Sequence, residues 1–248
     1  MTGTITLVGG GPGDPELLTV AACRALAVAD VVFLDKLAPQ QAVADWAPGA
    51  EVIDVGKRPG HHAVPQQQIE QQMIARARRG QRVVRLKGGD PFVLGRGHEE
   101  LQAAEAAGVP VRVIPGISSA VAVPAAAGIP VTHRGIAHGY TVLSGHVPPT
   151  DEQLDALVRL GSTLVVLMGI GTLPQLGAGL LRAGMAATTP VAAVERGTAP
   201  DQQVTTSDLA GLLTGALHAV RSPAVVVIGE VVRLGDASRL AAGHRVAS

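Results

Sequence analysis

Two glycine-rich segments follow short apolar runs and could bring bare backbone close to a ligand. The first, residues 9–15 (GGGPGDP), fits neither common nucleotide-binding pattern. Asp14 stands where a dinucleotide fingerprint needs glycine, and no lysine of a phosphate-binding loop precedes Lys36. The second, residues 86–92 (LKGGDPF), holds Asp90 beside two glycines, and its carboxylate could bind an amine or a ribose hydroxyl. The alternatives are two tight turns, with Asp90 capping the next helix. Two such loops in one domain favour ligand binding.

A third segment, residues 115–120 (PGISSA), begins a stretch of small residues. Ser118 would suit a helix N-cap there, and small residues allow close packing between domains. That account leaves Thr132-His133-Arg134 unexplained, since three polar residues follow an apolar turn.

Residues 57–62 (KRPGHH) form a basic cluster that is either a solvated loop or a means of concentrating an anionic substrate. His61 and His62 are a poor metal signal, because adjacent residues rarely converge on one ion. No carboxylate or cysteine follows them at ligand spacing. The sequence therefore predicts no metal site.

Two single residues stand at the ends of apolar runs. Asp35 follows residues 31–34, and Met168 ends residues 163–168. From the pattern alone, a loop or capping aspartate and a core methionine are the favoured interpretations. The carboxyl ends of strands are nevertheless where α/β enzymes keep their chemistry.

Alternating strand and helix patterns would position these residues. Gly80 and Gly108 fall where helix-terminating glycines belong. The strand runs are apolar throughout, as expected when helices cover both faces of a mainly parallel sheet. In the first half the patterns predict strands at 5–8, 31–34, 52–55, 83–86 and 111–114, and helices at 19–29, 65–79 and 98–107.

The second half repeats the alternation. It predicts strands at 140–143, 163–168, 191–194 and 224–228, and helices at 151–160, 173–183 and 207–219. We therefore predict an N-terminal α/β domain (1–116), a C-terminal α/β domain (117–235) and a tail (236–248). Ligands of open α/β sheets bind beyond the carboxyl ends of the strands, so we expect the site in a cleft between the two domains.

Composition limits the class of protein. Of 248 residues 47% are hydrophobic and 2% aromatic, so a core must consist of aliphatic side chains. Twenty basic and twenty acidic residues give zero net charge, which argues against nucleic acid or an anionic membrane as a general partner. The single Cys23 favours a reducing compartment. Without a visible export signal or an apolar run of membrane-spanning length, we expect a cytoplasmic location.

Taken in this order, the segments resemble the uroporphyrinogen-III C-methyltransferases of the tetrapyrrole methylase superfamily. The resemblance runs from Val8 to Val232, and the joint order and spacing make it specific. GKRPGHH followed by RLKGGDPF, and AGIPVTHRG, favour this branch over the sister precorrin enzymes. The remaining pieces are VGGGPGDPELLT, ADVVFLDKL, FVLGRGHEE, VIPGISSA, VLMG, VERGT and SPAVVVIGEVV.

The resemblance implies a two-domain α/β enzyme, usually homodimeric, that uses S-adenosylmethionine and no metal. Such enzymes methylate uroporphyrinogen III twice to give precorrin-2, for corrinoid or sirohaem biosynthesis, and release S-adenosylhomocysteine. By the same resemblance Asp35 is the proton acceptor and Lys57 the proton donor. The cofactor-binding residues are implied to be Pro12, Gly88, Gly89, Asp90, Val93, Ser118, Ser119, Met168 and Gly197. Leu34, Lys36 and Ser118 depart from the residues common in the family.

The implied chemistry suits these residue types. An electron-rich pyrrole carbon needs little beyond positioning to attack a sulfonium methyl, and a carboxylate can then take the ring proton. The several carboxylates of the substrate suit Arg58, His61, His62, Arg96 and Arg134.

Two other functions fit the same pattern: a later precorrin C-methyltransferase, or a non-catalytic tetrapyrrole- or nucleotide-binding protein. No further domain is apparent in the sequence. We therefore expect neither the dehydrogenase nor the ferrochelatase activity of bifunctional sirohaem synthases.

Overall fold

The computed structural model describes residues 2–56 and 64–235. The chain forms two compact units, Met1–Ser119 and Ala120–Ser248, and each contains one five-stranded sheet in its described part. The predicted α/β class is confirmed. The boundary predicted at residue 116 falls in the loop that follows the last strand of the first unit.

The sheet of the first unit is parallel throughout, in the order β3-β2-β4-β1-β5. Its central strands are buried along almost their whole length, which matches their continuous apolar sequences. The five predicted strands are present within one residue at each end: β1 (Thr4–Gly9), β2 (Val31–Leu34), β3 (Glu51–Asp54), β4 (Arg82–Lys87) and β5 (Val111–Ile114).

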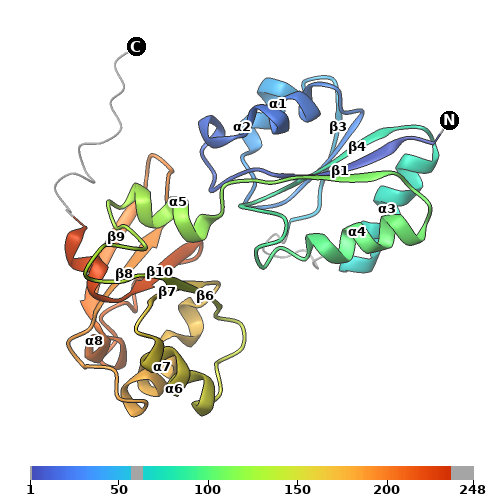
Figure 1. Cartoon of the computed structure of the whole chain (residues 1–248). Helices are drawn as coiled ribbons and strands as arrows, with labels where there is room; N and C mark the ends of the chain where they lie inside the picture. Colours follow the sequence, from blue (N-terminus) through green and yellow to red (C-terminus); the bar gives the residue numbers. More distant parts are fainter. Residues whose placement is uncertain (1, 57–63, 236–248) are drawn as a thin grey trace. The chain divides into compact units, whose positions relative to one another are not determined.

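Helices cover both faces of this sheet (Figure 1). α1 (Val20–Ala27) and α2 (Gln40–Trp46) pack on one face, and α3 (Gln66–Arg78) and α4 (Gly97–Ala106) on the other. Gly80 and Gly108 follow α3 and α4 with φ of +88° and +68°, so their predicted helix-terminating role is confirmed. The sequence patterns did not predict α2, a short helix without a side-chain cap.

The sheet of the second unit is mixed, in the order β6-β7-β10-β8-β9. β6 and β7 are parallel, whereas β10 runs antiparallel to both β7 and β8, and β9 antiparallel to β8. The expectation of a mainly parallel arrangement therefore holds only for the first unit. The strands are β6 (Tyr140–Ser144), β7 (Thr163–Leu167), β8 (Pro190–Glu195), β9 (Gln203–Asp208) and β10 (Ala224–Ile228).

The helix predicted at 207–219 is wrong over most of its length. Residues up to Asp208 form β9, and α8 covers only Leu209–Leu213. Only Ser207 and Asp208 of the predicted helix belong to β9, and beyond α8 the chain turns at Gly215, whose φ of +83° is not helical. Asp208 then begins α8 by accepting a hydrogen bond from the Gly211 N–H at 2.8 Å.

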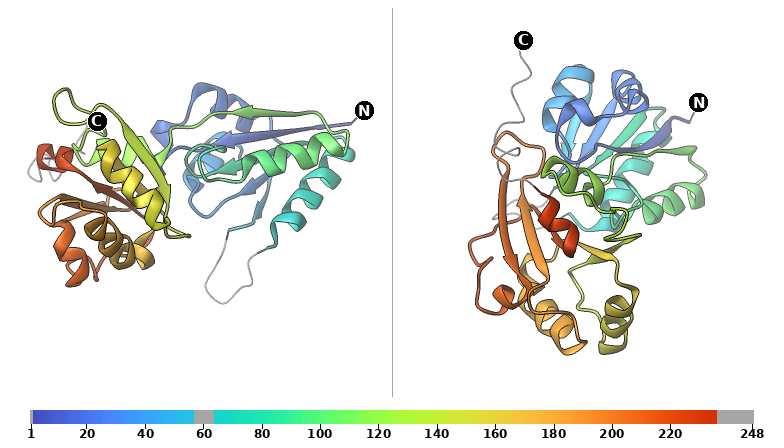
Figure 2. Two further views of the ribbon diagram at one scale, coloured as in Figure 1. Left: turned by 60° about the horizontal axis from the view of Figure 1, so that its bottom comes forward. Right: turned by 60° about the vertical axis from the view of Figure 1, so that its left-hand side comes forward.

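The second sheet has a hydrophobic core on each of its two faces. α6 (Asp151–Leu160), α7 (Leu173–Arg182) and α8 pack on one face, and α5 (Ser119–Ala126) packs on the other (Figure 2). α6 starts with a capping box in which Thr150 and Gln153 bond each other's backbone. Short 3₁₀ turns complete the chain at Pro15–Leu17, Ile170–Thr172 and Glu230–Leu234. Within residues 2–56 and 64–235, no helix has the length and apolar character that crossing a membrane requires.

Candidate active site

Two glycine-rich loops of the first unit are joined by backbone hydrogen bonds at the carboxyl end of the sheet. The Gly10 N–H donates to the Lys87 carbonyl at 2.7 Å, and Gly11 and Gly89 exchange hydrogen bonds of 3.2 and 2.6 Å. These bonds extend the β1–β4 pairing beyond its last register pair, Gly9 and Lys87. The loops that the sequence singled out separately therefore form one structure.

The glycines of these loops serve two different purposes. A Cβ on Gly9 would lie 2.4 Å from the Gly116 nitrogen, and one on Gly116 would lie 2.3 Å from the Gly89 carbonyl oxygen. Glycine is therefore required at positions 9 and 116, because the two backbones touch there and leave no room for a side chain. Gly89 has a φ of +66°, and a Cβ there would make only ordinary contact, with Ser119 Oγ at 3.5 Å. The space beside Gly89 and Ser119 is thus open to an atom that is not part of these loops.

Asp90 connects the loop after β4 to the loop after β5. One carboxylate oxygen accepts a hydrogen bond from the Phe92 N–H at 2.8 Å, and the other accepts from the Gly116 N–H at 3.1 Å. These bonds close the turn after β4 and tie it to the next loop. The alternative that Asp90 caps the next helix is wrong, because α4 begins at Gly97 and its N-cap residue is Arg96. A ligand role for Asp90 stays a prediction.

Asp35 lies directly after β2, on the same sheet edge. Its N–H continues the ladder to the Leu86 carbonyl at 3.0 Å, and its Oδ1 accepts from the Lys36 N–H at 2.8 Å. The side chain is half-buried, between the buried strand residue Leu34 and the exposed Lys36. The backbone of Asp35 therefore lies next to the end of β4, where the second glycine loop begins.

A cluster of buried charged side chains joins the end of β4 to α4, and the sequence analysis did not predict it. We call it the Arg85/Lys87/Glu100 cluster. Glu100 Oε1 accepts hydrogen bonds from Arg85 Nε at 3.0 Å, Lys87 Nζ at 3.1 Å and Gln66 Nε2 at 3.0 Å. The sequence signal for it was two basic residues, Arg85 and Lys87, two positions apart on one face of a strand with apolar neighbours.

The surroundings of Lys87 disfavour its charged form. Burial lowers the pKa of the Lys87 ammonium, and the Arg85 guanidinium lowers it further. The Glu100 and Asp35 carboxylates act in the opposite direction. Lys87 is thus a buried amine with a perturbed pKa at the carboxyl end of a strand, a combination typical of functional sites.

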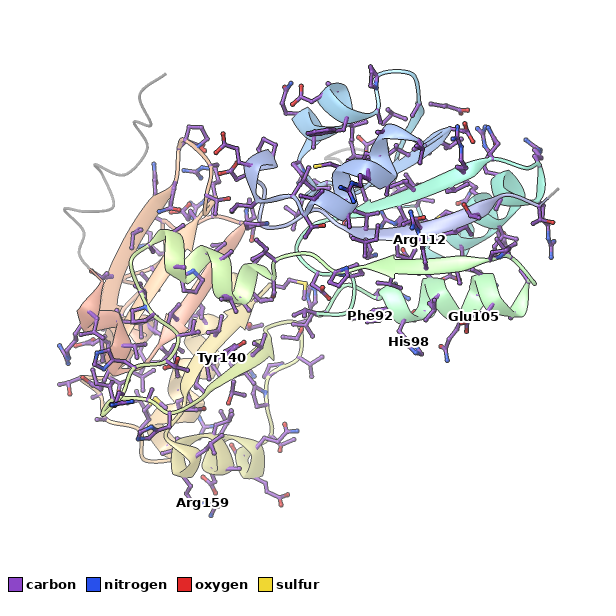
Figure 3. The ribbon with its side chains drawn as sticks, turned by 45° about the horizontal axis from the view of Figure 1, so that its top comes forward. Phe92, His98, Glu105, Arg112, Tyr140 and Arg159 are labelled. Carbon is purple, nitrogen blue, oxygen red and sulfur yellow. The ribbon has the colours of Figure 1, made fainter. Side chains whose placement is uncertain are left out.

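The loop between β4 and α4 is exposed, apolar and strained. Phe92, Val93 and Leu94 are all exposed, and Leu94 and Arg96 have φ of +54° and +58°. The rings of Phe92 and His98 lie 5.9 Å apart (Figure 3). Arg96 pairs with Glu99 and lowers the pKa of that carboxyl through their hydrogen bonds. Val93 and Arg96, both predicted as site residues, therefore lie on one loop.

In the second unit, Met168 and Gly197 follow two strands that end at the same sheet edge. β10 runs between β7 and β8 in the opposite direction, with Val225 opposite Leu167 and Ala224 opposite Glu195. Met168 is 42% exposed, so its interpretation as a core methionine is wrong. Its φ of +58° also ends the strand at Leu167, one residue before the prediction.

Gly197 lies between two residues in the left-handed region, Arg196 and Thr198, with φ of +46° and +72°. A Cβ on Gly197 would lie 2.4 Å from Cγ1 of Val123 on α5, so glycine is required there for packing. Left-handed residues other than glycine cost free energy and gather at functional sites. This edge of the second sheet has three of them.

The remaining predicted site residues are placed as follows. Pro12 and Ser118 are half-buried in the loops after β1 and β5, and Arg134 is exposed in a turn closed by hydrogen bonds between His133 and Ala137. Lys57, Arg58, His61 and His62 lie outside the described residues. In the part of the chain that the structure describes, no three His, Cys, Asp or Glu side chains are grouped as a metal site requires.

Comparison with protein families places the chain among known sequences. Residues 4–213 match the family model of tetrapyrrole (corrin/porphyrin) methylases. The chain is 46% identical over 240 residues to an S-adenosyl-L-methionine-dependent uroporphyrinogen III methyltransferase of Methanosarcina barkeri, with 94% of each chain covered. It is 45% identical over 236 residues to a uroporphyrinogen-III C-methyltransferase of Pseudomonas aeruginosa, covering 94% of this chain and 96% of that protein.

Other relatives are longer. The chain is 46% identical to the sirohaem synthase of Gluconacetobacter diazotrophicus but spans only 50% of its length. Among solved structures, a uroporphyrin-III C-methyltransferase of Thermus thermophilus complexed with S-adenosylhomocysteine matches with a TM-score of 0.81 at 41% identity, over 94% of both chains. A cobalt precorrin-4 methyltransferase matches with a TM-score of 0.80 at 28% identity, over 92% of this chain and 95% of that one.

Proposed function

The chain belongs to the tetrapyrrole (corrin/porphyrin) methylase family, and on this premise we propose that it is an S-adenosylmethionine-dependent uroporphyrinogen-III C-methyltransferase. It methylates uroporphyrinogen III twice and yields precorrin-2, an intermediate of corrinoid and sirohaem biosynthesis. The observation that carries the proposal is the 45–46% identity to two relatives with this name over at least 94% of each chain.

The first unit supports this proposal by its chemistry. The cofactor presents a sulfonium, a ribose and an adenine, which require close backbone approach and a few polar groups. The joined glycine loops offer such a surface, and the room beside Gly89 and Ser119 would admit part of the cofactor.

When bound, S-adenosylmethionine supplies an electrophilic methyl group, which the electron-rich pyrrole carbon accepts as the carbon–sulfur bond breaks. The methylated ring is then cationic and must lose a proton. Asp35 is a half-buried carboxylate at the carboxyl end of β2, beside the strand that leads into the second glycine loop, and in line with the resemblance we assign it this proton. Loss of this proton restores a neutral ring, and the carboxylate then releases the proton to solvent.

The other site assignments remain proposals. In the first unit they are cofactor contacts at Pro12, Gly88, Gly89, Asp90, Val93, Ser118 and Ser119, a proton donor at Lys57, and substrate contacts at Arg58, His61, His62 and Arg96. In the second unit they are cofactor contacts at Met168 and Gly197 and a substrate contact at Arg134. A homodimeric state is likewise proposed from the resemblance, and a cytoplasmic location from the single Cys23, which favours a reducing compartment.

The decisive experiment is incubation of the protein with uroporphyrinogen III and methyl-labelled S-adenosylmethionine. The mass of the product is then measured by mass spectrometry. Two labelled methyl groups per tetrapyrrole are the expected result. Transfer to a precorrin but none to uroporphyrinogen III would instead identify a later precorrin methyltransferase. Binding of both compounds without transfer would identify a non-catalytic binding protein.

The space beside Gly89 can be tested with a matched pair of variants. Gly89→Asn and Gly108→Asn both place asparagine at a φ near +67°, a conformation that asparagine tolerates better than most residues. The new side chain at residue 89 would overlap the proposed cofactor, whereas a Cβ on Gly108 meets no atom within 4 Å.

We expect Gly89→Asn to weaken S-adenosylhomocysteine binding about 10- to 100-fold, the Kd equivalent of ~1–3 kcal/mol of overpacking. Gly108→Asn should leave the Kd unchanged. Isothermal titration calorimetry on the two folded variants measures both values. Equal affinities would remove the loop after β4 from the cofactor site.

A further inference from the structure

The Arg85/Lys87/Glu100 cluster holds more positive than negative charge. It contains two basic side chains and one carboxylate, and their exposed fractions are 4%, 4% and 0%. Gln66, the fourth member of the hydrogen-bond network, is uncharged. Burying an unbalanced charge is costly, so a cluster of this kind needs another counterion close by.

The geometry of the strands places Asp35 on the same face of the sheet as Arg85 and Lys87. Arg85 and Lys87 are two positions apart on β4 and both reach Glu100 on α4. Phe33 on β2 packs in the core under α3 and α4, and Asp35 is two positions further along, where alternation returns to the same face. Leu34 pairs with Leu86, so Asp35 comes level with Lys87.

We propose that Lys87 is a positioning residue for Asp35: its buried ammonium attracts the neighbouring carboxylate and holds it in place at the end of β2. This inference rests on the proposed function, in which Asp35 takes the proton. Lys87 itself is 3% exposed and engaged by Glu100, so it acts through Asp35 and not on the substrate. Burial and Arg85 lower the pKa of Lys87, and the Glu100 and Asp35 carboxylates oppose this, so Asp35 is near enough to act on Lys87 as an opposite charge.

Other charged groups on the surrounding elements are more exposed than Lys87. Lys36 and Asp54 lie on the β2 and β3 ends, Glu70 is half-buried on α3, and Arg96 and Glu99 pair with each other at the start of α4. Exposed charges are screened by water and salt. Among the described residues, Lys87 and Arg85 are therefore the least screened cations on this face, and Lys87 is the one level with Asp35 on the neighbouring strand.

The test compares Lys87→Met with Lys36→Met. Both remove one lysine charge next to Asp35 with the same change of side chain, but Lys87 is buried and Lys36 is exposed. Lys87→Met leaves Arg85 and Glu100 as a balanced pair, so the variant should fold, which circular dichroism checks.

In Lys87→Met, kcat for methyl transfer should begin to fall about one pH unit higher on the acid side than in the parent protein. The activity ratio of variant to parent would then decrease about ten-fold toward acid pH and stay near one at alkaline pH. Lys36→Met should follow the parent. In an Asp35→Asn background, Lys87→Met should change the profile no further.

A second readout does not require activity. The ¹³C signal of the Asp35 carboxylate, assigned by its loss in Asp35→Asn, should titrate at a higher pH in Lys87→Met than in the parent protein. If the parent transfers no methyl group but this midpoint moves, the proposed reaction fails and the pairing stands. An unmoved midpoint, or a kcat loss that is equal at every pH, would overturn the positioning role of Lys87.

Discussion

Asp35→Asn is expected to lower kcat for methyl transfer to uroporphyrinogen III by about 10²- to 10⁴-fold, the usual contribution of a positioned general base. Asparagine keeps the shape of the side chain and can still accept the Lys36 N–H, so the turn after β2 should survive. Only the ability of the side chain to accept a proton is lost. Steady-state rates and calorimetry of S-adenosylhomocysteine binding separate the two effects, because only the rate should change.

Asp54→Asn is the matched control for this experiment. Asp54 ends the neighbouring strand β3, and its Oδ1 accepts the Gly56 N–H at 2.9 Å in a similar turn. This variant should keep the kcat of the parent protein. If Asp35→Asn also stays within a few-fold of the parent, proton removal belongs to another group or to water.

Glu100→Gln is expected to lower the free energy of unfolding by about 3–5 kcal/mol, the typical effect of breaking a buried ion pair from one side. The variant leaves Arg85 and Lys87 buried at 4% side-chain exposure without a counterion in the cluster. Glutamine fills the same volume, so lost packing cannot account for the result. Urea denaturation at neutral pH gives the difference directly.

Glu99→Gln tests whether burial is the cause. Glu99 is the preceding residue on α4 and also pairs with an arginine, Arg96, but both side chains are more than half exposed. Exposed pairs contribute little to stability, so this variant should unfold close to the parent midpoint. A similar loss in both variants would show that helix α4, and not the buried charge, is sensitive to the change.

The sequence by itself determined the architecture of the first unit. Continuous apolar runs separated by amphipathic stretches predicted a parallel sheet covered on both faces, and all five strands are found. Gly80 and Gly108 marked helix ends, since only glycine adopts a positive φ there without cost. The position of Asp35 at a strand end followed from the same pattern. These features depend on near neighbours in the chain, which is why they can be read locally.

Pairing between distant segments decided the rest. β9 forms because β8 offers it a partner, which no local pattern reveals, and Met168 is exposed because the backbone turns left-handed after β7. Gly9, Gly89 and Gly116 meet from three loops that are far apart in the sequence. The Arg85/Lys87/Glu100 cluster likewise exists only because α4 covers the face of the sheet to which Arg85 and Lys87 point, since its charges would be unremarkable as surface residues. Burial changes the energy of a charge, and burial is a property of the tertiary structure.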